Sequence, residues 1–235
     1  MSRVVAYVDG FNLYFGLRSK GWKKYYWLDL CALATVLLKP GQTLEGVHYF
    51  TSRIRANGRN VSDMQRQTVY LEALGTLPKL QSHFGHYLEK PKQCRQCGAQ
   101  WMDYEEKMTD VNIAMQLLTD AFEDRFDTAL LISADSDLTT PVSVVRAKFP
   151  GKNIIIALPP NRRSHQLTLA ASGSFIINET AYRRSQLPAQ VRRLRQLGVP
   201  MRRSCVPAKP IRPEARPPSS ICITRLPSMR SARSR

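Results

Sequence analysis

The sequence predicts an α/β fold with a mainly parallel central sheet, and three observations support this prediction. Short apolar runs suited to strands alternate along the chain with segments of helical pattern. Two of the runs, residues 4–8 and 128–133, are almost wholly apolar, which is typical of strands covered on both faces. Both runs stop at carboxylates, Asp9 in the first and Asp135 with Asp137 in the second. Because ligands of open parallel sheets bind beyond the carboxyl ends of the strands, these acids mark the expected site.

The remaining elements follow from the same patterns. We expect strands at residues 4–8, 46–52, 80–88, 128–133, 153–157 and 174–177, and helices at residues 12–17, 29–38, 62–74, 105–122, 138–147 and 164–171. Asp29 can cap the second helix and Pro40 stops it, whereas Gly75 and Pro78 close the third.

The chain of 235 residues is long enough for one domain of ordinary size and an appendage. We expect the domain at residues 1–187, with a cysteine-containing insertion at residues 89–104. Beyond residue 187 the periodicity fails, and arginine, proline and serine dominate. Such a composition does not bury enough apolar surface to offset its ordering entropy, so residues 188–235 are predicted to be a disordered basic tail.

The net charge of +17 favours a polyanionic partner, above all RNA or another nucleic acid. Much of the excess lies in the tail, and the alternative is that this tail has no specific role. No apolar run is long enough to span a bilayer, and the N-terminus lacks the layout of a signal peptide. Five cysteines form no disulfide framework, which favours a reducing cytoplasm. The oligomeric state is left open.

Three short motifs occur in a fixed order: Tyr7-Val8-Asp9-Gly10-Phe11-Asn12, Glu106-Lys107-Met108-Thr109-Asp110 and Ser133-Ala134-Asp135-Ser136-Asp137. Together they resemble the NYN domain family, a branch of the PIN-like nucleases, and in particular its LabA-like group. The resemblance covers roughly residues 3–187. It implies a Rossmann-like, PIN-type three-layer sandwich and a metal-dependent, RNase-type site.

Four carboxylates are therefore candidate ligands of Mg²⁺ or Mn²⁺, ions that prefer oxygen ligands: Asp9, Asp110, Asp135 and Asp137. A bound metal would lower the pKa of a water and generate the attacking hydroxide. Each acid also has a simpler interpretation, as a turn residue, a first-turn charge or a helix cap.

Other residues near this edge are given supporting roles. Asn12 could donate its amide to a phosphate or orient Asp9, Lys107 could pair with the scissile phosphate, and Ser133 could hold a carboxylate in its rotamer. The remaining acids of the middle of the chain are expected at the surface: Asp103, Asp120, Glu123 and Asp124.

Basic side chains after the predicted strands could contact phosphates of a nucleic acid. These are Arg53, Arg55 and Arg59 after residues 46–52, and Arg162 and Arg163 after residues 153–157, with Lys23 and Lys24 in an aromatic, basic loop. Aromatic residues of that loop could stack on bases, or Trp22 and Trp27 could pack under the sheet edge instead.

The segment Cys94-x-x-Cys97-Gly98 resembles half of a zinc ribbon and is a possible structural Zn²⁺ site. Such a site needs four ligands, and His83 with His86 could supply two. Positions three apart on a strand face opposite sides, however, which argues against that set. The alternative is an exposed thiol pair. A redox role is disfavoured because Cys94 does not open a helix after a strand.

The sequence predicts a metal-dependent ribonuclease that cuts phosphodiesters with metal-activated water. One alternative is a noncatalytic RNA-binding regulatory module. Another follows from a protein resembling the NYN group that is an NADH-dependent monooxygenase, a hydroxylase of a succinoylpyridine in nicotine degradation. The residues give NADH binding little support, because no G-x-G-x-x-G loop follows either acidic strand end.

Overall fold

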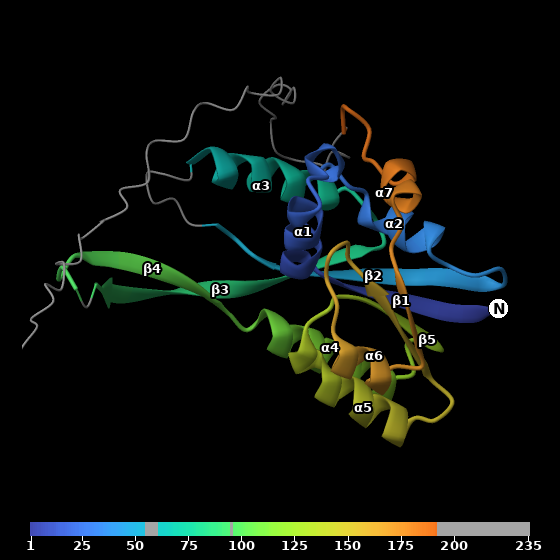
Figure 1. The fold of residues 1–235 in the computed structure, drawn as a ribbon. Helices are drawn as coiled ribbons and strands as arrows, with labels where there is room; N and C mark the ends of the chain where they lie inside the picture. Colours follow the sequence, from blue (N-terminus) through green and yellow to red (C-terminus); the bar gives the residue numbers. More distant parts are fainter. Residues whose placement is uncertain (55–60, 95, 192–235) are drawn as a thin grey trace, which may run out of the picture. The chain divides into compact units, whose positions relative to one another are not determined.

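The computed structural model describes residues 1–54, 61–94 and 96–191. They form a seven-stranded sheet in the order β4-β3-β2-β1-β5-β6-β7 (Figure 1). The strands are β1 (Ser2–Asp9), β2 (Gln42–Ser52), β3 (Leu80–Gln93), β4 (Gln100–Lys107), β5 (Thr128–Ile132), β6 (Asn153–Leu158) and β7 (Gly173–Ile176). Only the pair β3 and β4 is antiparallel, so six strands, all but β4, form the parallel sheet that the sequence predicts.

The helices are α1 (Gly10–Ser19), α2 (Leu30–Val36), α3 (Val61–Leu74), α4 (Thr109–Phe122), α5 (Thr139–Lys148), α6 (His165–Ala170) and α7 (Glu179–Arg184), with short 3-10 helices η1 (Lys23–Tyr25) and η2 (Ser136–Leu138). Side-chain oxygens cap several of them. Asp9, Asp29 and Asn178 each accept the backbone N–H three residues ahead, which satisfies a donor that the first turn leaves unpaired. The predicted cap at Asp29 is confirmed.

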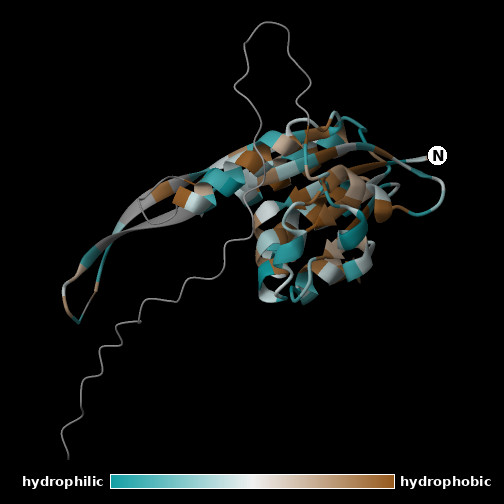
Figure 2. Ribbon diagram, turned by 90° about the horizontal axis from the view of Figure 1, so that it is seen from above, coloured by the Kyte–Doolittle hydropathy of each residue, from teal (hydrophilic) through white to brown (hydrophobic). Residues whose placement is uncertain are grey.

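Helices cover both faces of the sheet and make a three-layer sandwich. On one face α1, α2, α3 and α7 pack against Val4, Ala6 and Val8 of β1. On the other face α4, α5 and α6 pack against Val5 and Tyr7. Because successive strand residues point to opposite faces, this double cover explains the uninterrupted apolar run of β1. The two sets of helices lie above and below the sheet in Figure 1, and hydrophobic residues concentrate along the central strands in Figure 2.

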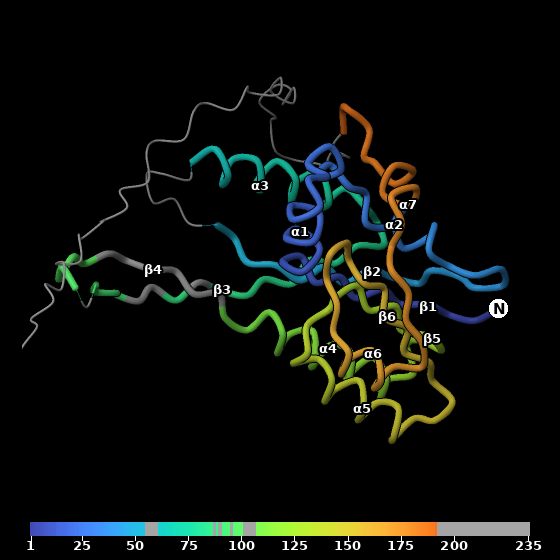
Figure 3. Tube along the Cα trace, viewed as in Figure 1, coloured from blue at the N-terminus to red at the C-terminus, as the bar shows by residue number. Residues whose placement is uncertain are grey.

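The segment before α4 differs from the prediction. Residues 105–107 were expected to open the long helix, but they end strand β4, which pairs with β3 from Gln93↔Gln100 to His86↔Lys107. Met108 then adopts a left-handed backbone (φ 76°), so the helix begins only at Thr109. The predicted insertion at residues 89–104 is accordingly the outer part of a β-hairpin, which the trace in Figure 3 follows from β3 through β4 to α4.

The chain changes direction across the sheet at β1. β2 and β3 lie on one side of β1, and β5, β6 and β7 lie on the other. The helix after β1 covers one face, whereas the helix after β5 covers the opposite face. Such a switch point opens a crevice at the carboxyl ends of the two strands, and ligands of open α/β sheets bind there.

Two sequence predictions fall outside the described residues. Arg55 and Arg59 lie in the undescribed segment 55–60, and all but the first residues of the predicted tail lie in residues 192–235. Within the described part of the chain, no helix is both long enough and apolar enough to cross a membrane.

Candidate metal centre at the sheet edge

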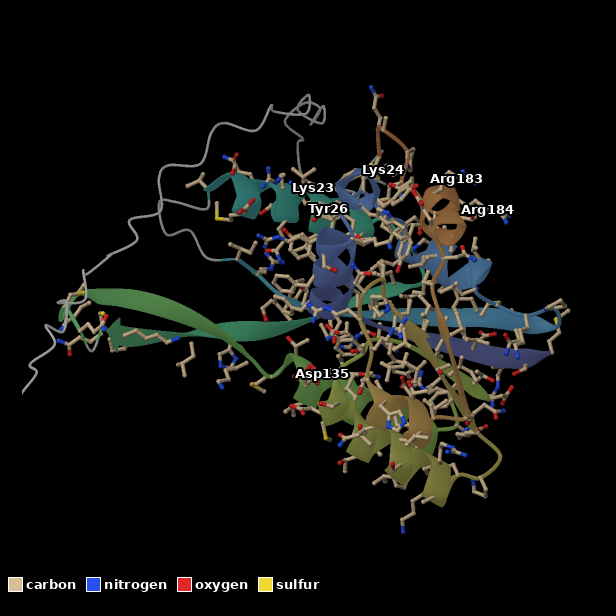
Figure 4. All side chains as sticks on the ribbon, viewed as in Figure 1. Lys23, Lys24, Tyr26, Asp135, Arg183 and Arg184 are labelled. Atoms are coloured by element: carbon tan, nitrogen blue, oxygen red, sulfur yellow. The ribbon has the colours of Figure 1, made fainter. Side chains whose placement is uncertain are left out.

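Three carboxylates meet at the switch point. Asp9 ends β1, Asp110 lies in the first turn of α4, and Asp135 caps η2 just beyond β5. One oxygen from each of the three lies within 4.8 Å of the others. Figure 4 shows Asp135 at this edge, beside the start of α4. Three acids that are far apart in the sequence therefore form one compact oxygen cluster.

The Asp9 carboxylate is held by neutral donors. Its Oδ1 accepts the backbone N–H of Asn12 at 2.9 Å, and its Oδ2 accepts the Asn12 side-chain amide at 2.7 Å. The Ser133 hydroxyl donates to the same Oδ2 at 2.8 Å. Asp9 itself is only 1% exposed, so these contacts fix its rotamer in the core.

Ser133 connects two of the acids. Besides donating to Asp9, its Oγ accepts the backbone N–H of Asp135 at 3.0 Å, and Ser133 is fully buried. The Oδ1 of Asp135 in turn accepts the N–H of Asp137 at 3.0 Å. The loop after β5 is thus shaped by hydrogen bonds that run from Asp9 through Ser133 to Asp135.

The electrostatics of the cluster suit a cation. Burial raises the pKa of the Asp9 carboxyl above its ordinary value, and the neighbouring Asp135 carboxylate adds to the rise. Hydrogen bonds from Asn12 and Ser133 offset only part of it. The ionised form of Asp9 is therefore disfavoured here, and a bound cation would reverse that preference.

The structure places Asp137 and Lys107 differently from the sequence prediction. Asp137 is exposed and is not part of the group formed by Asp9, Asp110 and Asp135. Lys107 is half-buried at the end of β4, opposite His86, and not on the helix where the sequence placed it.

Two of the predicted basic residues flank the cluster. Arg53 follows β2, and its guanidinium lies 4.6 Å from the centre of the Phe84 ring. Arg162 follows β6 and lies 5.9 Å from the centre of the Phe15 ring. Since β2 and β6 lie on either side of the pair β1 and β5, the two arginines stand at the same carboxyl edge as the acids. The neighbouring Arg163 is exposed.

The aromatic, basic loop lies elsewhere. Lys23 and Lys24 form η1, beyond the far end of α1 from Asp9, and Figure 4 shows them well away from Asp135. Lys24 pairs with Glu179 at 3.0 Å. Trp22 and Tyr25 pack edge to face on each other, and both contact the buried Tyr182. These rings therefore pack on one another and on the core, as the packing alternative expects for Trp22.

A buried polar network under α4 was missed by the sequence reasoning. Asp120 is 4% exposed, although it was expected at the surface. Its Oδ2 accepts the Tyr7 hydroxyl at 2.7 Å and lies 3.3 Å from Nε2 of His48. The Nδ1 of His48 lies 2.9 Å from Nε2 of His83. The network therefore joins β1, β2 and β3 to α4.

The helical period could have revealed this network. Ile113, Leu117 and Ala121 are the buried apolar residues of α4, spaced four apart. Asp120 lies seven residues after Ile113 and three after Leu117, so it shares their face. A carboxylate on the buried face of a helix needs hydrogen-bond partners, and residues of the neighbouring strands are the natural source.

The structure agrees with the strand-spacing argument against a zinc site completed by His83 and His86. His83 is occupied by His48 and stacks on Phe50, with ring centres 4.6 Å apart. His86 is eight strand residues before Cys94, which is about 26 Å at roughly 3.3 Å per residue. Neither histidine therefore reaches the cysteines in the same chain.

This fold and this edge define an α/β domain with an acidic cluster compatible with a divalent metal. A family model described as "NYN domain" matches residues 3–179, and the chain belongs to that family. The family is nuclease-like, as the three sequence motifs predicted.

Two further similarities are more distant. The chain is 27% identical over 179 residues to 6-hydroxy-3-succinoylpyridine 3-monooxygenase HspA of Pseudomonas putida. That match covers 62% of this chain and 56% of the relative, so the chain spans little more than half of that relative's length. A solved structure of a Vibrio parahaemolyticus protein of unknown function shares 18% identity, with a TM-score of 0.48 over 76% of this chain and 94% of the other.

Proposed function

We propose that this protein is a metal-dependent ribonuclease that hydrolyses phosphodiesters at the carboxyl edge of its sheet. The observation that carries the proposal is the cluster of Asp9, Asp110 and Asp135, whose oxygens lie within 4.8 Å of one another. Membership of the NYN family and the strongly basic chain are consistent with it.

The donor set fits Mg²⁺ or Mn²⁺. All three groups are carboxylates, and hard divalent cations prefer oxygen ligands. The raised pKa of Asp9 supports the same conclusion, because a nearly buried acid without a cationic partner is poorly stabilised in its ionised form. When bound, the metal would supply a nucleophile by lowering the pKa of a water, and it would neutralise charge on the phosphate.

The chain's own residues prepare the site. Asn12 and Ser133 hold Asp9 in one rotamer, and Ser133 also positions the backbone of Asp135. Such outer contacts orient ligands before substrate arrives. Asp137 faces solvent, so its proposed contribution is to the edge of the site rather than to its buried centre.

Arg53 and Arg162 suit the phosphates of a strand lying across this edge. Each guanidinium lies over a phenylalanine ring, a contact that restrains its orientation and leaves its N–H groups available to phosphate oxygens. One lies on the β2 side of the acids and the other on the β6 side, so a single-stranded RNA could contact both while its backbone passes Asp9 and Asp135.

The test is cleavage of an end-labelled single-stranded RNA by the full chain with Mn²⁺ or with EDTA. We expect cleavage that requires the metal and is lost in Asp9→Ala, Asp110→Ala and Asp135→Ala. Asp137→Ala should reduce cleavage less than Asp135→Ala. Asp63→Ala is the matched control, since Asp63 is an exposed acid on α3 that pairs with Arg66.

Other outcomes separate the alternatives. RNA binding without cleavage under any metal would favour a noncatalytic binding module. Oxidation of NADH in the presence of a hydroxypyridine would favour a monooxygenase. Cleavage that persists in both Asp9→Ala and Asp135→Ala would show that the site is assigned to the wrong residues.

A further inference from the structure

The tip of the β3–β4 hairpin carries a second cluster of reactive side chains, far from the carboxylates. β3 pairs with β2 only as far as Gly85, and from His86 to Gln93 it pairs with β4. Cys94 and Cys97 lie in the turn that joins the two strands, at the far end of this two-stranded extension. Figure 1 shows the extension reaching away from the helices of the sandwich.

The turn itself has the geometry of a metal-binding knuckle. The N–H of Cys94 donates to the carbonyl of Ala99 at 2.8 Å, and the N–H of Gly98 donates to the carbonyl of Cys94 at 2.9 Å. Gly98 has a φ of 71°, a left-handed conformation that favours glycine and lets the chain double back after Cys97. Both cysteines are thereby held in one tight turn.

The Cys94 sulfur faces hydrogen-bond donors of its own turn. Backbone N–H groups of Cys97 and Gln96 donate to it, and the thiol of Cys97 adds a further hydrogen bond. Cysteine ligates metals as the thiolate, and amides directed at the sulfur stabilise a ligand of that charge, so the geometry of this turn suits metal binding.

We propose that Cys94 and Cys97 form half of a zinc site that a second copy of this chain completes. A structural Zn²⁺ takes four ligands, and this turn offers two. Among the described residues, the group of three or more metal-binding side chains is the acidic cluster, which contains neither cysteine. Two hairpin tips related by a two-fold axis would each contribute the same pair, and the four thiolates would enclose one ion.

The remaining cysteines of the chain are poorer partners. Cys31 belongs to α2, and burial raises its pKa to about 11, which disfavours the thiolate. Cys205 and Cys222 are 17 positions apart and lack the spacing of a knuckle. The second copy, by contrast, supplies an identical Cys-x-x-Cys-Gly turn.

Charge and stability favour the same arrangement. Four thiolates around Zn²⁺ carry a net negative charge, and the sequence next to the turn is basic, with Lys90, Lys92 and Arg95. A two-stranded hairpin with no third strand is marginally stable on its own. A zinc ion joining two tips would stabilise both extensions and would make a dimer.

The test measures metal content and mass of the purified full chain in reducing buffer, with added Zn²⁺ and after removal of excess metal. We expect one zinc ion for two chains, a dimer by sedimentation velocity, and a monomer after chelation. Cobalt in place of zinc should give the absorption typical of tetrahedral coordination by four thiolates. Cys94→Ser and Cys97→Ser should each abolish zinc binding and dimer formation.

The matched control is the double variant Cys205→Ser/Cys222→Ser, which should keep both the zinc and the dimer. One zinc per monomer, lost in this double variant, would place the missing ligands in the same chain and overturn the proposal. Zinc retained by Cys94→Ser, or no zinc bound by the parent, would also overturn it. Mn²⁺-dependent RNA cleavage by Cys94→Ser tests the proposed function separately from the zinc site, because the hairpin tip is not part of the carboxylate edge.

Discussion

Asp9 shows how a single residue can link stability to metal binding. Its carboxylate is almost fully buried, and its described neighbours are three neutral donors, from Asn12 and Ser133, and the carboxylates of Asp110 and Asp135. Without a cation, ionising this group costs free energy, because burial and Asp135 both oppose the charge. A bound cation would stabilise the ionised carboxylate that burial and Asp135 disfavour. The residue that weakens the metal-free fold is therefore also the central candidate ligand.

The first prediction concerns the pH dependence of metal-free stability. The pKa of Asp9 is raised in the folded state, so its contribution to stability is full below the unfolded pKa and is lost as pH rises through the folded pKa. In EDTA, Asp9→Asn should therefore gain in free energy of unfolding relative to the parent as pH rises from about 4, the ordinary value for Asp. Urea titrations across this range measure the difference.

Added Mn²⁺ is the control for that experiment. If the ion binds at Asp9, it should stabilise the parent near neutral pH and leave Asp9→Asn nearly unchanged. Curves for parent and variant that run parallel across the pH range, with equal responses to Mn²⁺, would contradict the prediction.

The second prediction concerns Ser133 as a positioning residue. Ser133→Ala removes the donor to Asp9 and the acceptor for the N–H of Asp135, both within hydrogen-bond distance. We expect Mn²⁺ affinity and RNA cleavage to fall about 10- to 100-fold, the usual effect of removing an outer contact to a metal ligand. Calorimetric titration with Mn²⁺ separates this from a purely structural role.

A threonine variant tests the same contact conservatively. Ser133→Thr keeps the hydroxyl and should retain more Mn²⁺ affinity than Ser133→Ala if the added methyl group is accommodated. Equal Mn²⁺ affinity in Ser133→Ala and the parent would show that Ser133 does not position the ligands.

At the residue scale, the sequence predicted the three acids that gather, but it also included Asp137, which is not part of the cluster. Strand ends identified Asp9 and Asp135, and the start of the long helix identified Asp110. Asp137 was indistinguishable from Asp135 in the sequence, since both follow the same strand. The structure separates them because η2 turns Leu138 into the core, while Asp137 faces solvent. Metal ligation itself stays a prediction.

At the scale of elements, the approach of α1 to β2 and to the loop after β6 depends on two glycines. A Cβ on Gly10 would lie 2.7 Å from the carbonyl oxygen of Phe50, and one on Gly16 would lie 2.8 Å from Cβ of Pro159. The close contact at Gly10 lets α1 begin directly after Asp9, so the chain can leave β1 at the switch point without displacing β2. The Asp-Gly of the first motif is thus a packing requirement as well as a turn.

The buried polar network around Asp120 is a second feature at the scale of elements, because it connects α4 to three strands. Burial alone would raise the pKa of Asp120, but hydrogen bonds from His48 and Tyr7 outweigh it and lower the pKa. Burial and the neighbouring His48 lower the pKa of His83, which favours its neutral form. An N–H of neutral His83 can then donate to His48, and His48 can donate to Asp120.

The third prediction follows from this network. Asp120 accepts from Tyr7 and His48 at Oδ2 and from Gln116 at Oδ1, whereas an asparagine amide has one accepting oxygen, so Asp120→Asn loses the acceptor on one side. We expect a loss of about 1–3 kcal/mol in the free energy of unfolding at neutral pH. Because the folded pKa of Asp120 is lowered, its contribution is present above the unfolded pKa and is lost as pH falls through the folded pKa. The deficit of the variant should therefore shrink in acid.

Asp63→Asn is the surface control for this loss, and it should change stability by no more than about 0.5 kcal/mol. Chemical denaturation of both variants at several pH values measures the two losses in the free energy of unfolding. A deficit for Asp120→Asn no larger than that of Asp63→Asn would show that the network does not stabilise the fold.

The elements that the sequence predicted well are those with an unambiguous period. The parallel strands and the helices between them follow from apolar runs and capping residues. Residues 105–107 were wrongly assigned to the long helix because Glu105, Glu106 and Lys107 are good helix formers and lie just before a true helix. Their pairing with β3 is a long-range contact that local propensity does not reveal, and the left-handed Met108 between strand and helix leaves no clear sequence signal.

At the scale of the whole molecule, charge is distributed very unevenly. Residues 192–235 hold twelve of the 35 lysines and arginines and one of the 18 acids, which is +11 of the net +17. In the described domain, several basic side chains are already paired with acids, including Arg3 with Asp124 and Asp127, and Lys24 with Glu179. The tail should therefore supply much of the long-range attraction for the proposed RNA substrate, whereas the proposed chemistry belongs to the sheet edge.

The last prediction separates these two contributions by their salt dependence. Each phosphate neutralised on single-stranded RNA contributes about −0.7 to the slope of log K against log salt concentration. Replacing Arg192, Arg193 and Arg195 by Gln should therefore make the slope less steep by up to about 2, if all three contact phosphates.

Arg125→Gln is the control, because Arg125 pairs with Glu123 at 2.8 Å and lies beyond the far end of α4 from Asp110. Fluorescence anisotropy with a labelled RNA in EDTA measures binding without cleavage. Cleavage of saturating RNA at low salt should be equal in the two variants, because neither change touches Asp9 or its neighbours. A slope that does not change in the triple variant would mean that this part of the tail does not bind the backbone, and the attraction would then have to come from the arginines at the sheet edge.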